Sequence, residues 1–286
     1  MRICTVIAAA AALAALVTVP AGAGAAGLAR LWVTEDVLEV PESVCWDQAR
    51  EIMYVSNISG KPLEKDGRGF ISRIDIEGGI RKLHWVSGLN APKGMGVFEG
   101  SLYVTDIDEV VEIDIAGDSI RARYPAAGAV FLNDIAVDAD GDVYVSDYSS
   151  DNGVIYRLRG GEMEVWLEHE LIERPNGLCI DDGRLVVGSS GTGTLVSVDL
   201  EDKSVEETIV IGTSIDGVEI TDGGNFVVSN WSGRTVLAEP DGSITILLDT
   251  TAEGINSADL EYVPGRGIVL IPTFGDNRVL AARLTE

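Results

Sequence analysis

The sequence predicts an all-β protein, a six-bladed β-propeller with four strands per blade and a ring closed by an N-terminal strand. Three observations predict this fold. A short alternating strand recurs six times along the chain, with a period of about 40 residues that is typical of propellers. Turn pairs such as Asp140-Gly141 and Asp182-Gly183 separate neighbouring strands and supply the positive φ of tight hairpins. No amphipathic helix pattern of useful length is present.

The recurrent strand ends in a small or polar residue in most repeats and covers residues 53–57, 102–106, 143–147, 185–189, 226–230 and 268–272. A second apolar strand precedes each copy. The residues that begin these preceding strands, called anchors here, are Glu42, Lys93, Asn133, Asn176, Asp216 and Ala258. The anchors are spaced 51, 40, 43, 40 and 42 residues apart, so each spacing marks one blade.

Third and fourth strands follow in each repeat. We expect third strands at 70–75, 110–114, 154–158, 195–199, 236–239 and 279–283, and fourth strands at 80–86, 120–124, 163–167, 205–211 and 244–248. The sixth repeat has no room for a fourth strand before Glu286. We expect the segment around Leu31 to Val40 to supply it, which would close the ring and remove a free sheet edge.

The N-terminal segment is typical of a secretory signal. Met1 and Arg2 precede an apolar run over residues 3–19, and small residues suited to cleavage follow it. A membrane anchor is the alternative, but the run is short for a span. We therefore expect a cleaved signal over residues 1–27, a propeller over 28–286, and a periplasmic or secreted protein.

Composition limits the partners. The chain has 46 Asp and Glu against 21 Lys and Arg, a net charge of −25, which argues against nucleic acid and against an anionic membrane surface. A small-molecule substrate remains, and the sequence does not predict an oligomeric state. Two His leave little room for His-based metal or triad chemistry.

The three Cys are too few for a disulfide framework. Cys45 and Cys179 each lie three residues after an anchor. Because side chains alternate along a strand, we expect both to point away from the channel. Their blades, the first and the fourth, lie opposite each other, so we expect two buried free thiols.

The anchors suggest a cation site. The first strand of a blade lines the central channel, so the anchors should ring one mouth of it. Glu42, Asn133, Asn176 and Asp216 then bring two carboxylates and two carboxamides together, an all-oxygen set that Ca²⁺ prefers. A divalent ion would also offset the repulsion between the carboxylates. The alternative is that these residues are ordinary strand-start and turn residues. The pattern does not separate Ca²⁺ from Zn²⁺, Mn²⁺ or Mg²⁺.

Over roughly residues 37–284 the chain resembles the gluconolactonase, senescence-marker and luciferin-regenerating-enzyme family. Four motifs carry the resemblance, in the family's order: Glu42-Ser-Val-Cys-Trp46, Leu132-Asn133-Asp134, Pro175-Asn176-Gly177-Leu178 and Asp216-Gly217-Val218. Family members are six-bladed propellers with a divalent ion, often calcium, in the channel mouth. The resemblance implies that Glu42, Asn176 and Asp216 are metal ligands. It also implies that Asn133 binds substrate or a metal-bound water, and that Asp216 is the general base or nucleophile.

Departures from the family pattern affect the expected substrate. Sugar lactonases of the family often carry an Arg two residues before the Asn of the second motif, where this chain has Phe131. The Glu motif usually has Pro-Val before its Trp, where this chain has Val44-Cys45. Lys93 is the anchor of the second blade. Its ammonium could bind an anionic group or stabilise an oxyanion, could replace the cation beside Glu42 or Asp216, or could point to solvent.

We therefore hypothesise a divalent-metal-dependent hydrolase of a lactone or small ester. The metal would polarise the carbonyl and Asp216 would activate water, with Asn133 and Lys93 completing the candidate catalytic set. Two alternatives remain open: a phosphotriester hydrolase using the same site, and a non-catalytic periplasmic ligand-binding or scaffold propeller.

Overall fold

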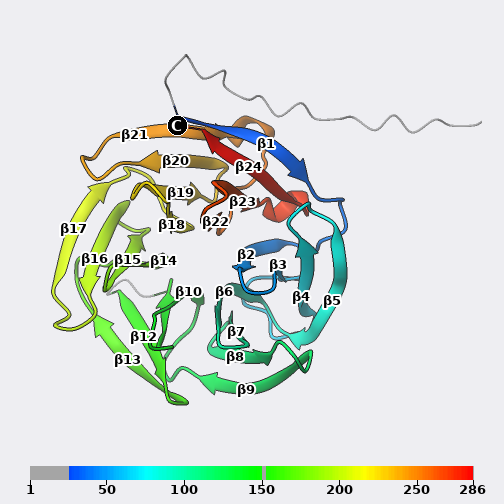
Figure 1. Ribbon diagram of the computed structural model, residues 1–286. Helices are drawn as coiled ribbons and strands as arrows, with labels where there is room; N and C mark the ends of the chain where they lie inside the picture. Colours follow the sequence, from blue (N-terminus) through cyan, green and yellow to red (C-terminus); the bar gives the residue numbers. More distant parts are fainter. Residues whose placement is uncertain (1–25, 150–152, 286) are drawn as a thin grey trace, which may run out of the picture.

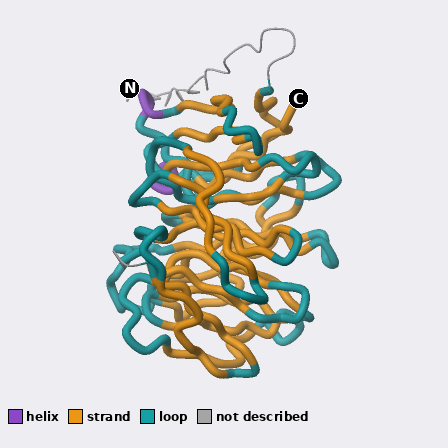
Figure 2. Tube along the Cα trace, turned by 90° about the vertical axis from the view of Figure 1, so that its left-hand side faces the viewer, coloured by secondary structure: helices purple, strands orange, loops and turns teal. Residues whose placement is uncertain are grey.

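A computed structural model describes residues 26–149 and 153–285. Six antiparallel sheets of four strands each are arranged in a ring (Figure 1), which Figure 2 shows from the side, and this confirms the six-bladed propeller. The expected signal, residues 1–27, lies outside the described residues except for Ala26 and Gly27. Within the described ranges, no helix has the length and apolar character needed to cross a membrane.

The blades follow one another along the chain. Blade 1 contains β2 (Pro41–Asp47), β3 (Ile52–Asn57), β4 (Gly69–Asp75) and β5 (Ile80–Leu89); blade 2 contains β6 (Pro92–Phe98), β7 (Ser101–Asp106), β8 (Glu109–Asp114) and β9 (Ser119–Pro125); blade 3 contains β10 (Leu132–Val137), β11 (Val143–Asp147), β12 (Val154–Arg159) and β13 (Glu162–Glu168). Blade 4 contains β14 (Pro175–Asp181), β15 (Arg184–Ser189), β16 (Thr194–Asp199) and β17 (Val205–Val210); blade 5 contains β18 (Val218–Ile220), β19 (Phe226–Asn230), β20 (Arg234–Ala238) and β21 (Ile244–Asp249). Blade 6 contains β22 (Glu261–Val263), β23 (Ile268–Pro272), β24 (Val279–Thr285) and, from the other end of the chain, β1 (Gly27–Val33). Two short 3₁₀ helices, η1 (Thr251–Glu253) and η2 (Phe274–Asp276), lie in the loops of blades 5 and 6.

The closing strand lies earlier in the chain than expected. β1 pairs with β24 from Gly27↔Thr285 to Val33↔Leu280 (Figure 1), so only the first part of the expected 31–40 segment is strand. Residues 34–40 instead connect the outer edge of blade 6 to the innermost strand of blade 1. This connection has to turn, and Val40 adopts a positive φ of 55° there.

Burial falls from the channel outward. The inner strand β2 is buried along its whole length, whereas the outer strand β9 alternates between exposed and half-buried residues. Hydrophobic clusters join neighbouring blades; one packs Tyr54 and Ile71 of blade 1 against Leu102 and Val111 of blade 2. The apolar alternation of the repeats therefore holds adjacent blades together.

A hydrogen bond from the second strand fixes the start of several inner strands. The pairing register shifts at the start of β2, β6, β10 and β14, where the anchors lie. The N–H of the residue after the anchor then needs an acceptor. It donates to a hydroxyl of the recurrent strand in three blades: Ser43 to Ser56 (3.0 Å), Asp134 to Ser146 (2.9 Å) and Gly217 to Ser229 (2.8 Å). This explains the small hydroxyl residue that recurs in these repeats.

The same region joins one blade to the next. The hydroxyl of Ser229 also donates to the Ala258 carbonyl of blade 6 at 2.7 Å. A Cβ added at Gly217 would lie 2.5 Å from the backbone nitrogen of Leu260, closer than side chains tolerate. The Gly after the Asp216 anchor is therefore required by close approach of the neighbouring strand.

The loops that lead to the anchors are held by the last residue of the recurrent strand. The carboxylate of Asp106 accepts the N–H groups of Asn90 and Ala91, and Asp147 accepts those of Val130 and Phe131. These acidic residues therefore shape the channel mouth through the backbone.

Replacement of Ser229 by Ala leaves the buried N–H of Gly217 without its acceptor. We expect Ser229→Ala to lower the free energy of unfolding by about 1–3 kcal/mol, the usual cost of such a loss. The exposed Ser119 in β9 offers the matched control, and Ser119→Ala should stay within about 0.5 kcal/mol. Denaturant unfolding measures both variants, and equal stabilities would contradict the assigned role of the hydroxyl.

Candidate functional site

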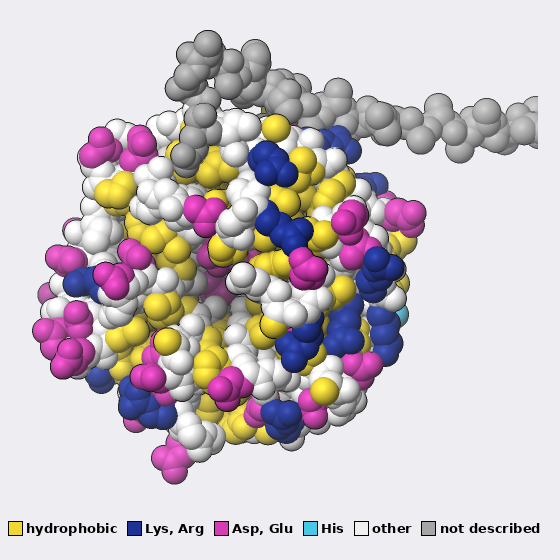
Figure 3. Space-filling view, viewed as in Figure 1, with side chains coloured by type: hydrophobic (Ala, Val, Ile, Leu, Met, Phe, Trp, Pro, Cys, Tyr) yellow, Lys and Arg dark blue, Asp and Glu magenta, His cyan; other side chains and the backbone are white. Residues whose placement is uncertain are grey.

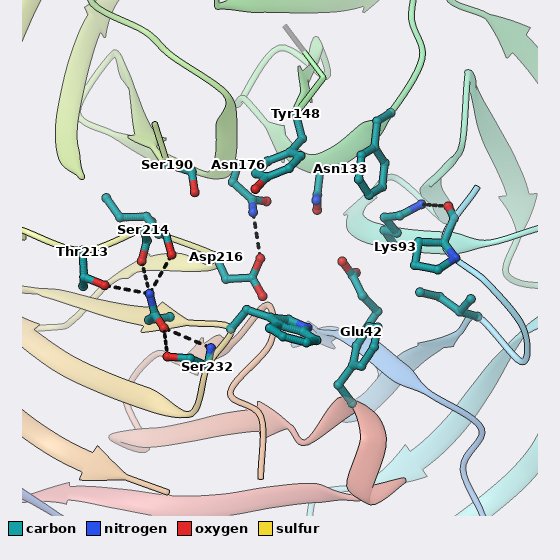
Figure 4. A pocket seen from close by; sticks show the side chains of 17 residues that line it. Glu42, Lys93, Asn133, Tyr148, Asn176, Ser190, Thr213, Ser214, Asp216 and Ser232 are labelled. Atoms are coloured by element: carbon teal, nitrogen blue, oxygen red, sulfur yellow. Dashed lines mark hydrogen bonds between the residues drawn. The ribbon is translucent and has the colours of Figure 1, made fainter. Parts of the chain in front are cut away.

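A cavity of about 510 Å³ lies at the mouth of the channel formed by the anchors (Figure 4). Glu42, Lys93, Asn133, Asn176 and Asp216, from five different blades, all line it, and each is at most 6% exposed. The sixth anchor, Ala258, is fully buried and is not among the lining residues. The remaining lining residues lie in or next to the loops at this mouth: Ile58, Pro62, Phe131, Tyr148, Ser190, Thr213, Ser214, Ile215, Asn230, Trp231, Ser232 and Phe274.

Four buried oxygens in this cavity have no hydrogen-bond partner among the described residues. They are Oε2 of Glu42, Oδ1 of Asn133, Oδ1 of Asn176 and Oδ2 of Asp216. The amide nitrogen of Asn176 donates to Oδ1 of Asp216 at 2.7 Å, so the amide turns its oxygen away from that bond. Figure 4 shows these four side chains directed toward a common space.

These residues fit a hard cation. Buried polar atoms normally form hydrogen bonds, and four such oxygens without partners in one place are destabilising because their desolvation is not compensated. Within the described residues no group of three or more His, Cys, Asp or Glu side chains is arranged to hold a metal. The set consists instead of two carboxylates and two carboxamides, and such oxygen donors suit Ca²⁺ better than Zn²⁺.

Burial also disfavours the charged form of both carboxylates. Burial raises the pKa of Asp216 to about 7, against a smaller opposing effect of the Asn176 hydrogen bond. Burial and the neighbouring Asp216 raise the pKa of Glu42 well above its ordinary value, although Lys93 opposes this shift. Without a cation, the pair therefore retains protons at a pH where free carboxylic acids have lost theirs.

Lys93 lies in the cavity wall. The side chain is 1% exposed, which contradicts the alternative that it points to solvent. Its ammonium donates to the carbonyls of Pro62 (3.1 Å) and Ala91 (3.0 Å) and lies 4.8 Å from the ring centroid of Phe131. Burial lowers the pKa of Lys93 to about 8, and Glu42 partly offsets this effect. The bond to Pro62 also attaches the long 59–69 segment of blade 1 to the cavity.

The channel continues to be acidic below the cavity. Asp134 and Asp259, each one residue after an anchor, are buried, and the carboxylate of Asp134 accepts the N–H groups of Ile135 and Leu178. Burial raises the pKa of Asp134 to about 7 and that of Glu261 to about 8. Figure 3 shows Asp and Glu side chains in the central hollow of the face it draws.

Cys45 and Cys179 are buried free thiols, as expected. Cys45 packs in the hydrophobic cluster between blades 1 and 2, and Cys179 packs in the cluster between blades 4 and 5. Both are also among the residues that line a second cavity of about 260 Å³, with Glu219 and Glu261. This cavity lies at the other end of the inner strands.

Two aromatic pairs stand in the wall of the first cavity. The rings of Phe131 and Tyr148 meet edge to face at 5.5 Å, and those of Trp231 and Phe274 do so at 5.5 Å. Neither His84 nor His169 is among the residues that line the cavity.

The family comparison agrees with this geometry. The family described as the SMP-30/gluconolactonase/LRE-like region matches residues 40–258. The chain belongs to this family. A search of curated protein sequences finds no significant match.

Solved structures resemble the chain in fold. A gluconolactonase from Xanthomonas campestris shares 17% identity with a TM-score of 0.69, over 92% of this chain and 91% of that one. A catalytically inactive virginiamycin B lyase from Staphylococcus aureus with quinupristin shares 14% identity with a TM-score of 0.63, over 91% of this chain and all of that one. At these identities the likeness shows the propeller fold alone.

The structure thus brings every predicted site residue to one cavity. Sequence reasoning missed Asp259 and Phe274 entirely and gave no role to Asp134 or Trp231. Asp134 and Asp259 share one signal, their position directly after an anchor. Tyr148 and Trp231 each directly follow a copy of the recurrent strand, so the repeat places both at this mouth. Phe131 and Phe274 hold no equivalent positions, and no sequence signal identified the four as one wall.

The buried channel acids make stability depend on pH. The folded-state pKa of Glu261, about 8, lies above its ordinary value of 4.5, so the folded protein binds more protons between these values. Stability of the chelator-treated protein should fall as pH rises from about 4.5 to about 8. Glu261→Gln keeps an oxygen for the Trp46 N–H that Glu261 now accepts at 2.8 Å, and should make this fall shallower.

Thermal unfolding across this pH range measures the effect, at about 2–4 °C per kcal/mol. The exposed Glu77 provides the control, and Glu77→Gln should leave the slope unchanged. A slope that Glu261→Gln does not alter would contradict the burial effect.

Proposed function

We propose that the protein hydrolyses a lactone or small ester with the help of a divalent cation in the channel mouth. One observation carries the proposal: four unpartnered oxygens from four blades face one cavity in a member of the SMP-30/gluconolactonase/LRE-like family. Membership of the family supports a lactonase-type hydrolase in general. The metal, the roles of the residues and the step described below are the proposed part.

Glu42, Asn176 and Asp216 would hold the cation, and Ca²⁺ fits their oxygens best, with Mn²⁺, Mg²⁺ or Zn²⁺ as the alternatives. A bound cation supplies Lewis-acid polarisation of the substrate carbonyl. It also offsets the burial cost of two carboxylates, which Lys93 alone offsets in part.

Asp216 accepts the proton of the attacking water. Its Oδ1 is held by the Asn176 amide, and this bond orients the carboxylate so that Oδ2 faces the cavity. Asn133 contributes a further buried oxygen from blade 3 and orients the water or the substrate.

Lys93 supplies positive charge to the wall beside Glu42. Two of the three N–H groups of its ammonium are used by the carbonyls of Pro62 and Ala91, which fixes the ammonium in place. The third is available to a substrate oxygen. A fixed cation near the reacting carbonyl stabilises the charge that develops on its oxygen.

Calcium binding tests the site without any substrate. Calorimetric titration of the chelator-treated protein should show one Ca²⁺ per chain, and Asp216→Asn should weaken binding by at least about 100-fold. Asp140, in the exposed turn between β10 and β11 of blade 3, provides the control for the same chemical change. Asp140→Asn should bind Ca²⁺ as the wild type does. Unchanged Ca²⁺ binding by Asp216→Asn would contradict the role of Asp216 as a cation ligand.

Turnover tests the role of Lys93. With γ-butyrolactone as substrate, Lys93→Met should lower kcat by about 10²-fold with a smaller effect on KM, as for loss of a charge-stabilising donor. A purely structural role would lower the melting temperature and leave kcat of the folded fraction unchanged. Hydrolysis of a phosphotriester but no lactone, or binding without hydrolysis, would contradict the proposed reaction.

A further inference from the structure

We infer that the substrate carries a flat apolar or aromatic group beside its lactone or ester head, and that Trp231, Phe274, Phe131 and Tyr148 bind this group. The inference rests on the proposed function, because it names the substrate class of the same cavity. Four features of the cavity wall support it.

Trp231 and Phe274 form a pair at the rim, in which Trp231 is exposed and Phe274 is half-buried. Trp231 is 50% exposed, although large apolar side chains are normally covered. Phe274 adopts a left-handed φ of 48°, a strained value for a bulky residue. Asn256 ties the two loops together, since its amide donates to the Trp231 carbonyl at 2.9 Å and its oxygen accepts from Gly275. The chain thus holds an apolar surface open to solvent at a conformational cost.

Phe131 and Tyr148 form a second pair, contributed by blade 3. The backbone of Phe131 is fixed by Asp147 at 3.1 Å, and the Tyr148 N–H donates to the Phe131 carbonyl at 3.0 Å. The Phe131 ring also lies against the Lys93 ammonium. Both pairs are therefore pre-organised. An aromatic ligand could pack against the edges and faces of these rings without the entropic cost of ordering a loop.

The polar side chains of the wall are mostly occupied by one another. The amide nitrogen of Asn230 donates to the hydroxyls of Thr213 (2.9 Å) and Ser214 (2.8 Å), and its oxygen accepts from the Ser232 hydroxyl. The amide of Asn230 therefore has its partners within the wall, and the hydroxyls of Thr213 and Ser214 already use acceptor capacity that a ligand hydroxyl would need. This favours a substrate with a single polar head.

The unpartnered oxygens and the aromatic pairs lie in one cavity of about 510 Å³, within the usual range for a small-molecule site. The head would lie at the oxygens of the anchors and the apolar group along the wall. Removal of aromatic surface from water then adds to affinity.

The test compares γ-phenyl-γ-butyrolactone with γ-butyrolactone, which share a reacting head, and with gluconolactone, which is rich in hydroxyls. We expect kcat/KM for the phenyl lactone to exceed that for each of the others by about 10-fold or more. Trp231→Ala should lower the value for the phenyl lactone about 10-fold and that for γ-butyrolactone much less. Val210, 68% exposed on the outer strand β17, supplies the control, and Val210→Ala should change neither.

The outcomes separate the two claims. Three results would overturn this inference and leave the proposed function standing. They are hydrolysis of all three lactones with no preference for the phenyl group, a preference for gluconolactone, and an equal effect of Trp231→Ala on both butyrolactones. If no lactone is hydrolysed, the proposed function fails. Calorimetric binding of γ-phenyl-γ-butyrolactone then tests the inference alone: binding weakened about 10-fold by Trp231→Ala supports it, and no binding overturns it.

Discussion

The hydrogen bond between a recurrent-strand hydroxyl and the residue after an anchor is the interaction on which the site depends. It satisfies the N–H that the irregular start of an inner strand leaves free, as in Ser146 with Asp134 and Ser229 with Gly217. The same hydroxyl of Ser229 reaches the next blade, so the starts of neighbouring inner strands are fixed relative to one another. Side chains from blades about 40 residues apart in sequence can then meet at one point with little freedom.

That convergence creates an electrostatic problem. Carboxylates enter the channel at three depths, with Glu42 and Asp216 at the mouth, Asp134 below them and Glu261 near the far end, and burial raises the pKa of each. The positive charge of Lys93 acts on Glu42 and lowers its pKa, but the ammonium is hydrogen-bonded to backbone carbonyls. A divalent cation at the four unpartnered oxygens is the simplest source of the missing positive charge, and it would place a Lewis acid where a carbonyl can reach it.

The sequence predicted the parts of the structure that repeat. The period, the anchors and the Asp-Gly turns located six blades and brought Glu42, Lys93, Asn133, Asn176 and Asp216 to one mouth, because those features depend on backbone geometry shared by all blades. It misplaced the closing strand, since pairing of Gly27–Val33 with β24 depends on contacts between the chain ends. Tyr148 and Trp231 directly follow recurrent strands, so their place at the mouth follows from the repeat. The pairing of their rings with Phe131 and Phe274 was not predictable, because it depends on loop paths set by tertiary contacts.

Anomalous diffraction from crystals grown with Mn²⁺ would test the central claim most directly, because it locates the cation independently of affinity or turnover. The account predicts one strong peak in the cavity, within coordination distance of Oε2 of Glu42, Oδ1 of Asn176 and Oδ2 of Asp216. A cavity without a peak in crystals that bind Mn²⁺ elsewhere, or a Lys93 ammonium turned into contact with those oxygens, would contradict it.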